Sequence, residues 1–216
     1  MYRLIVFDLD GTVLDTLDDL ASATNYALQT HGYPTRTREE VRAFVGNGVK
    51  NLIDRAIGVE GEKNAEVLAT FRAYYEAHRA DQTATYEGIL PLLEEIKALG
   101  VKTAVLSNKP DHATKALAEK YCAGLFDCVM GENEAGGVRK KPAPDALFAL
   151  TERFGVPMAE TLYIGDSEVD IETSENAGVD CVCVTWGFRD EEVLRRCGAT
   201  RFAYTPSEIL KWIKGV

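Results

Sequence analysis

The chain has 216 residues, of which 46% are hydrophobic, and its 34 acidic against 24 basic side chains give a formal net charge of −10. This size allows one domain, or one domain with a sizeable insertion, around a packed core. The negative charge has the wrong sign for a generic nucleic-acid or anionic-membrane binder, so we expect a small-molecule partner, no nucleic acid and no membrane. A bound cation and a few basic side chains can reverse the local electrostatic field, so the net charge does not exclude an anionic substrate.

The cysteines give no sign of a disulfide framework or a zinc site. They are odd in number and contain no Cys-x-x-Cys pair: Cys122, Cys128, Cys181, Cys183 and Cys197. This usage fits a reducing compartment. The first apolar run is too short for a signal peptide, and no later run reaches the length of a membrane span. We therefore expect a cytoplasmic protein, either a monomer or a homodimer.

The first expected element is a strand over "RLIVF" (3–7), whose unbroken hydrophobicity is typical of a strand covered on both faces. From residue 15 to about 84 only helical periodicity follows. An apolar stripe runs from Leu17 to Gly32, and Thr37 with Glu40 predicts a capping box at the next helix. We expect a helical domain over 15–84, inserted into a core of residues 1–14 and 85–216.

From residue 101 onward, strand-like runs alternate with helical patterns. Strands are expected at 101–107, 127–131, 161–165, 180–186 and 200–204, and helices at 111–122, 144–155, 167–178, 190–197 and 206–214. This alternation predicts an α/β fold with a doubly wound, mostly parallel sheet.

Asp8 and Asp10 follow the first strand in the run "DLDGT". Alternate residues of a strand point the same way, so both carboxylates are expected to project together, and Mg²⁺, which prefers oxygen ligands, would offset their repulsion. Gly11 permits a sharp exit from the strand, and Thr12 offers a hydroxyl and a backbone N–H to an anion. The same string is typical of a plain turn, so by itself it leaves both interpretations open.

Three later stretches place polar residues at strand ends or helix starts. These are "SNK" with Ser107, "KKPAPD" with Lys141, and "GDSEVD" with Asp166 and Asp170. Taken separately, they fit helix caps and a solvated lysine. Taken in order with "DLDGT", they resemble the four motifs of the haloacid dehalogenase-like superfamily. The helical insertion resembles the cap of the subgroup that includes phosphoglycolate phosphatases and β-phosphoglucomutases.

The resemblance spans nearly the whole chain and implies a Rossmann-like core. In that core, the strand ending at Asp8 lies between the strands ending at Ser107 and Gly165. The resemblance implies that Asp8 is the nucleophile that attacks phosphorus and forms an aspartyl-phosphate. Asp10 would be the acid/base that protonates the leaving alkoxide and then activates water. Ser107 and Lys141 would neutralise the oxygens of the transferring phosphoryl group.

The resemblance also implies a Mg²⁺ site. The metal would be held by the carboxylates of Asp8 and Asp166 and by the backbone carbonyl of Asp10. Asp170 would support the site from the side or through water. Asn108 would offer its backbone N–H or its amide to the phosphate, together with the Gly11 and Thr12 groups.

In the insertion, Gly46, Asn47 and Gly48 resemble the substrate-specificity loop of the same subgroup. Glycine lets backbone amides approach an anion closely, although a helix end followed by a turn would use the same residues. Lys109 and Lys140, which are adjacent to the motif residues Asn108 and Lys141, are expected to be solvated.

The function implied is a Mg²⁺-dependent phosphatase acting on a small phosphorylated metabolite, with phosphoglycolate the first substrate to test. The same residues would serve a β-phosphoglucomutase-like mutase, which returns the phosphoryl group to another hydroxyl of a sugar phosphate. Pyrophosphatases and nucleotidases share the pattern as well. The least favoured alternative is a non-catalytic phosphate-binding module, because all four motif residues are intact: Asp8, Asp10, Lys141 and Asp166.

Overall fold

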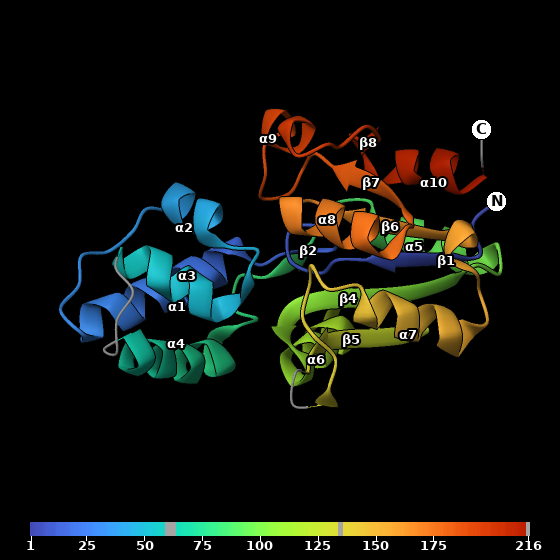
Figure 1. The fold of residues 1–216 in the computed structure, drawn as a ribbon. Helices are drawn as coiled ribbons and strands as arrows, with labels where there is room; N and C mark the ends of the chain where they lie inside the picture. The colour runs from blue at the N-terminus through green and yellow to red at the C-terminus, as the bar shows by residue number, and fades with distance from the viewer. Residues whose placement is uncertain (59–63, 134–135, 215–216) are drawn as a thin grey trace. The chain divides into compact units, whose positions relative to one another are not determined.

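Residues 1–58, 64–133 and 136–214 are described by the structure, a computed structural model (Figure 1). The chain divides into two units, which we call the core unit (Met1–Leu14 with Thr85–Val216) and the helical unit (Asp15–Ala84). The chain passes from one unit to the other twice. Two short strands, β2 (Leu14–Asp15) and β3 (Ala84–Thr85), pair at these crossings.

A six-stranded sheet forms the centre of the core unit, in the order β5–β4–β1–β6–β7–β8 (Figure 1). The strands are β1 (Leu4–Phe7), β4 (Lys102–Pro110), β5 (Cys128–Glu132), β6 (Thr161–Gly165), β7 (Asp180–Val184) and β8 (Phe202–Ala203). All neighbouring pairs are parallel. The predicted α/β class and the predicted position of the first strand between its two motif-bearing neighbours are confirmed.

The central strand β1 is apolar throughout, because helices cover the sheet on both sides. Its residues Leu4–Phe7 are completely buried. In the register of the sheet, Phe7 lies beside Val105 of β4 and Ile164 of β6. The residues that follow these three strands therefore meet at one edge of the sheet.

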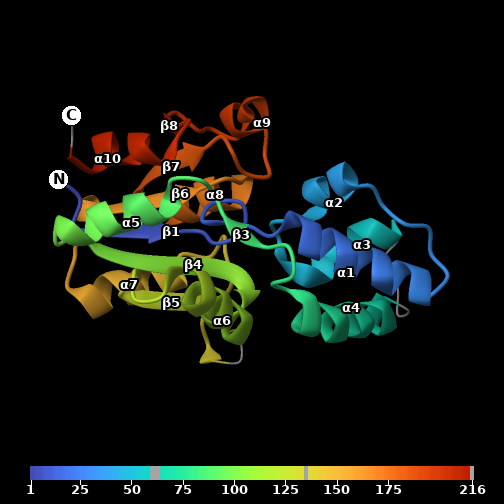
Figure 2. The same cartoon turned by 180° about the vertical axis from the view of Figure 1, so that it is seen from behind.

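Helices α7 and α8 cover one face of the sheet and α5 and α6 cover the other, as Figures 1 and 2 show from opposite sides. The helices of the core unit are α5 (Ile89–Ala98), α6 (Asp111–Cys122), α7 (Asp145–Phe154), α8 (Glu168–Ala177), α9 (Glu191–Arg196) and α10 (Pro206–Lys214). The bounds of α6 and α10 agree with the predicted ranges. Helix α5 is absent from the predicted elements, although its buried residues Ile89, Leu92, Leu93 and Ile96 follow helical spacing. It contains Pro91 in its first turn, where a missing N–H is tolerated.

The helical unit contains α1 (Leu17–Thr30), α2 (Arg38–Phe44), α3 (Gly48–Ile57) and α4 (Asn64–His78) in its described part. The predicted capping box is confirmed: Thr37 accepts a hydrogen bond from the Glu40 N–H, and the Glu40 carboxylate accepts one from the Thr37 N–H. Buried Asp19 accepts hydrogen bonds from the N–H and hydroxyl of Thr83, which ties the end of the unit to α1.

Among the residues that the structure describes, none of the helices combines the length and the apolar character needed to cross a membrane.

Candidate active site

The predicted site residues of the core unit meet at the edge of the sheet where β1, β4 and β6 end. Asp8 follows β1, Ser107 lies near the end of β4, and Asp166 follows β6. The Asp8 N–H still donates to the carbonyl of Ile164, at 2.8 Å, so the first aspartate is fixed by the sheet itself. Strand order reverses at β1, and doubly wound sheets bind ligands at such a point.

Three buried carboxylates gather at this edge. The nearest oxygens of Asp8, Asp166 and Asp170 all lie within 4.8 Å of one another. Burial, and after it the charge of Asp170, raises the pKa of Asp166 to about 7. Burial also raises the pKa of Asp8 well above its ordinary value, against the opposing charge of Lys141. Buried like charges are costly without a cation among them, and a set of carboxylate oxygens fits a hard divalent ion such as Mg²⁺.

Lys141 supplies positive charge to the acid cluster. Its ammonium lies 2.9 Å from Asp8 Oδ1 and 2.7 Å from Asp170 Oδ1, and it donates to the hydroxyl of Tyr163 at 3.1 Å. Burial alone would lower the pKa of Lys141, but the charges of Asp170 and Asp8 outweigh that effect and raise it. The lysine therefore stays charged, and it stabilises the ionised form of Asp8.

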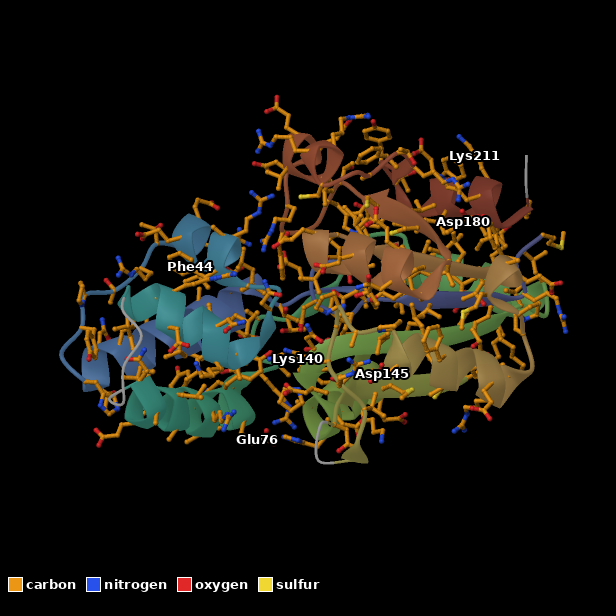
Figure 3. The ribbon with its side chains drawn as sticks, viewed as in Figure 1. Phe44, Glu76, Lys140, Asp145, Asp180 and Lys211 are labelled. Atoms are coloured by element: carbon orange, nitrogen blue, oxygen red, sulfur yellow. The ribbon has the colours of Figure 1, made fainter. Side chains whose placement is uncertain are left out.

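The side chain of Asn108 holds the loop that carries Lys141. Asn108 Oδ1 accepts from the Lys141 N–H at 2.8 Å, and Nδ2 donates to the Lys141 carbonyl at 3.0 Å. On the other side of the loop, Arg139 pairs with Asp145, the first residue of α7, at 2.6 Å. Asp145 and the half-buried Lys140, which also belong to this stretch of the chain, are labelled in Figure 3. The motifs do not suggest that the side-chain amide of Asn108 holds this loop. The contact of the Asn108 backbone N–H with phosphate stays a prediction.

Asp170 is fully buried and accepts hydrogen bonds on both carboxylate oxygens. Oδ2 accepts from the Asp166 and Ser167 N–H groups and, at 2.6 Å, from the Ser167 hydroxyl. Oδ1 accepts from Lys141 and from the Tyr163 hydroxyl. These donors occupy most of the lone pairs of the carboxylate, so its geometry suits a supporting role beside a metal better than direct coordination.

The segment Trp186–Arg189, after β7, holds Asp166 in place. The Phe188 N–H donates to Asp166 Oδ2 at 2.6 Å, and the hydroxyl of fully buried Thr12 donates to Oδ1 at 3.1 Å. The Trp186 indole N–H in turn donates to the Thr12 carbonyl at 3.1 Å. None of the sequence motifs points to this segment. The only available signal is a glycine between two aromatic residues just after a strand, which is typical of close backbone approach.

That glycine, Gly187, leaves no room for a side chain. A Cβ at this position would lie 2.5 Å from the Gly11 carbonyl oxygen and would overlap the Cβ of Asp166. Gly11 approaches the same carboxylate, and its own Cβ would lie 2.9 Å from Asp166 Oδ1. Both glycines are therefore needed to enclose Asp166.

We expect Gly187→Ala to lower the free energy of unfolding by about 1–3 kcal/mol, because the added methyl group must displace Asp166 or the Gly11 loop. Chemical denaturation of both proteins measures this difference. A substituted protein as stable as the original would contradict the close packing around Asp166.

The prediction of a solvated Lys109 is wrong. Its side chain is buried, and its ammonium lies 3.1 Å from Asp10 Oδ2. Strand β4 continues to Pro110, beyond the predicted end at Ser107, so Lys109 lies within the strand. The Ser107 hydroxyl accepts from the Lys109 N–H at 3.2 Å. The longer strand therefore carries Lys109 to the site instead of into solvent.

Gly46, Asn47 and Gly48 lie in the helical unit, between α2 and the start of α3. The two glycines have φ angles of 123° and 82°, and the Asn47 carbonyl accepts from the side chain of Asn51 at 2.9 Å. Their contact with a substrate stays a prediction.

The fold and the site define an α/β protein with helices inserted after its first strand and with a buried cluster of carboxylates and lysines at the reversal of its sheet. Residues 5–184 match the family model of the haloacid dehalogenase-like hydrolases. The chain belongs to this family.

Curated proteins and solved structures agree with this assignment. A phosphoglycolate phosphatase of Pseudomonas syringae pv. tomato is 37% identical over 195 residues, which cover 86% of this chain and 70% of that protein. A phosphoglycolate phosphatase of Vibrio parahaemolyticus is 34% identical, with coverage of 97% and 95%. These relatives and the family confirm the predicted superfamily and the prediction of a phosphatase enzyme.

Among crystal structures, a Lactobacillus delbrueckii subsp. bulgaricus protein proposed to be a phosphoglycolate phosphatase superposes with a TM-score of 0.95, at 36% identity and 98% coverage of both chains. CbbY from Rhodobacter sphaeroides, solved in complex with phosphate, superposes with a TM-score of 0.77 at 25% identity, and covers 97% of this chain and 96% of its own.

Proposed function

We propose that the protein is a Mg²⁺-dependent phosphatase that hydrolyses a small phosphorylated metabolite through an aspartyl-phosphate, with phosphoglycolate as the first substrate to test. The observation that carries the proposal is the buried cluster of Asp8, Asp166 and Asp170, with Lys141 2.9 Å from Asp8. The relatives named phosphoglycolate phosphatase support the choice of substrate.

In the proposed reaction, a carboxylate oxygen of Asp8 attacks phosphorus, the ester bond breaks, and an acyl phosphate forms on Asp8. Lys141 is held by Asp170 and Tyr163, and its ammonium neutralises charge on the transferring oxygens. The Ser107 hydroxyl contributes to the same neutralisation. Water then cleaves the acyl phosphate, which releases inorganic phosphate and restores the Asp8 carboxylate.

Asp10 is the proposed acid/base. It gives a proton to the leaving alkoxide in the first step and takes one from the attacking water in the second. Asp10 lies two residues after the nucleophile, beyond the end of β1, and its carboxylate is 3.1 Å from the ammonium of Lys109 on β4.

The proposed metal ligands are the carboxylates of Asp8 and Asp166 and the backbone carbonyl of Asp10. When bound, Mg²⁺ supplies positive charge at the phosphoryl oxygens. The chain holds these ligands in place. The Thr12 hydroxyl and the Phe188 N–H donate to the Asp166 carboxylate, and the Asp170 carboxylate accepts from the Asp166 N–H.

We further propose that residues 15–84 form the cap domain and that residues 1–14 and 85–216 form the catalytic core. In this proposal Gly46, Asn47 and Gly48 of the cap contact the substrate through their backbone amides. The cytoplasmic location and the monomeric or homodimeric state stay predictions.

Metal removal tests the proposal. We expect EDTA to lower the hydrolysis of phosphoglycolate by at least about 100-fold and added Mg²⁺ to restore it, because the cation offsets charge that the site otherwise leaves uncompensated. Mg²⁺ should also raise the thermal unfolding midpoint of the free protein, a readout that needs no substrate.

EDTA already saturated with Mg²⁺ is the control. Full activity in free EDTA together with an unchanged unfolding midpoint would contradict the metal site. Release of one inorganic phosphate per substrate consumed distinguishes hydrolysis from a mutase reaction, which would instead yield a rearranged sugar phosphate.

A further inference from the structure

Lys109 is a second buried lysine at the site, and the proposed reaction gives it no task. Its side chain is 3% exposed, and its ammonium pairs with the Asp10 carboxylate at 3.1 Å. Burying an ammonium is costly unless its charge has a use or a partner. Lys141, the other buried lysine of the site, already pairs with Asp8 and Asp170.

The backbone around Lys109 is held firmly. Its N–H donates to the Ser107 hydroxyl at 3.2 Å, and its carbonyl accepts from the Thr114 hydroxyl of α6 at 3.1 Å. Because the residue lies within β4, its ammonium is presented by a rigid element, as is typical of groups that recognise a ligand.

The two lysines lie at different positions relative to the proposed reaction. Lys141 is beside Asp8, where phosphorus is attacked, whereas Lys109 is beside Asp10, which protonates the leaving oxygen. In-line transfer places the attacking and leaving oxygens on opposite sides of phosphorus. An acid/base must approach its oxygen to about 3 Å, so an ester oxygen that faces Asp10 Oδ2 lies within about 6 Å of the Lys109 ammonium.

We propose that Lys109 binds a negatively charged group of the leaving alcohol and thereby selects phosphomonoesters that carry a carboxylate close to the ester oxygen. This inference rests on the proposed phosphatase function and deepens it. In phosphoglycolate a single methylene separates the ester oxygen from the carboxylate carbon, so the carboxylate reaches the ammonium while Asp10 faces the ester oxygen. An ammonium has three donors and can hold Asp10 and the substrate carboxylate together.

A purely positioning role for Lys109 gives a different expectation. If the lysine only orients Asp10, its loss slows every phosphomonoester by the same factor. If it binds the leaving group, its loss slows esters with a carboxylate more than uncharged ones. Selectivity between two substrates therefore separates the two roles, whereas the rate with one substrate does not.

The test compares phosphoglycolate with 2-hydroxyethyl phosphate, in which an uncharged CH₂OH replaces the carboxylate. We expect the unmodified protein to prefer phosphoglycolate by roughly 10- to 100-fold in kcat/KM, the size of one hydrogen bond to a charged group. Lys109→Met should bring this ratio close to one, and Lys109→Arg, which keeps the charge, should retain part of it. Lys115→Met is the matched control, since the exposed Lys115 side chain pairs with Asp111 on α6, and the ratio of this variant should not change.

An unmodified protein that hydrolyses both esters equally well, or a folded Lys109→Met protein that keeps the preference, overturns the inference and leaves the phosphatase proposal intact. Failure to hydrolyse any phosphomonoester overturns the proposed function instead, and the inference with it. Circular dichroism shows whether Lys109→Met folds. If it does not, the preference of the unmodified protein and that of Lys109→Arg decide the outcome.

Discussion

The Asp8→Asn protein is expected to fold normally and to lose phosphate release by at least about 10⁴-fold, because an amide does not form an acyl phosphate. The fold should persist for two reasons. The asparagine oxygen can still accept the hydrogen bond that Asp8 Oδ1 now accepts from the Leu9 N–H, and Lys141 keeps Asp170 as a charged partner. Steady-state phosphate release with Mg²⁺ and phosphoglycolate measures the loss.

Asp127→Asn is a suitable control for this substitution. Asp127 precedes β5 at the opposite edge of the sheet and pairs with Lys102 at 2.7 Å, so its replacement should leave turnover unchanged. Activity of the Asp8→Asn protein equal to that of the control would exclude the proposed nucleophile.

Lys141→Met is expected to reduce both turnover and stability. Removing the ammonium leaves the Asp8 and Asp170 carboxylates buried without their shared partner, which should lower the free energy of unfolding by about 3–5 kcal/mol. Turnover should fall by roughly 10²- to 10³-fold or more, because one preorganised positive charge is lost at the transferring phosphoryl group. Denaturant unfolding and phosphate release measure the two effects separately.

The neighbouring Lys140 offers a matched control, since Lys140→Met makes the same chemical change one residue away, in a half-buried side chain outside the acid cluster. We expect it to alter neither quantity. A Lys141→Met protein with the stability of the Lys140→Met protein would show that the buried ion pairs do not stabilise the core unit, and unchanged turnover would remove Lys141 from the reaction.

The sequence was enough to predict where the chemistry gathers, because three of the four motifs follow a strand whose apolar run is easy to recognise. Parallel strands bring their carboxyl ends to one edge, so Asp8, Ser107 and Asp166 had to lie near one another once the sheet was predicted. The bounds of α6 and α10 were predictable for a similar reason. Their apolar spacing is regular and their first residues are typical of helix starts.

Features that depend on register and strand length were not predictable. The predicted strand ends at Ser107, whereas β4 continues through an irregularity in its pairing until Pro110 lies beside Glu132. This continuation decides whether Lys109 is buried or solvated, and no local pattern reveals it. The hydrogen bond from Phe188 to Asp166 is equally hidden, because a backbone N–H leaves no trace in residue type.

In the described part of the chain, all the ion pairs and hydrogen bonds around Asp8, Lys141 and Asp166 join residues of the core unit. This unit lies on either side of the insertion, whose junctions are at Leu14 and Thr85. The proposed reaction centre is thus built by one unit alone. If residues 15–84 form the proposed cap, exchange of the inserted helices should change the range of esters admitted without rebuilding these contacts. Chimaeras that carry another insertion between these junctions would test this consequence through their specificity.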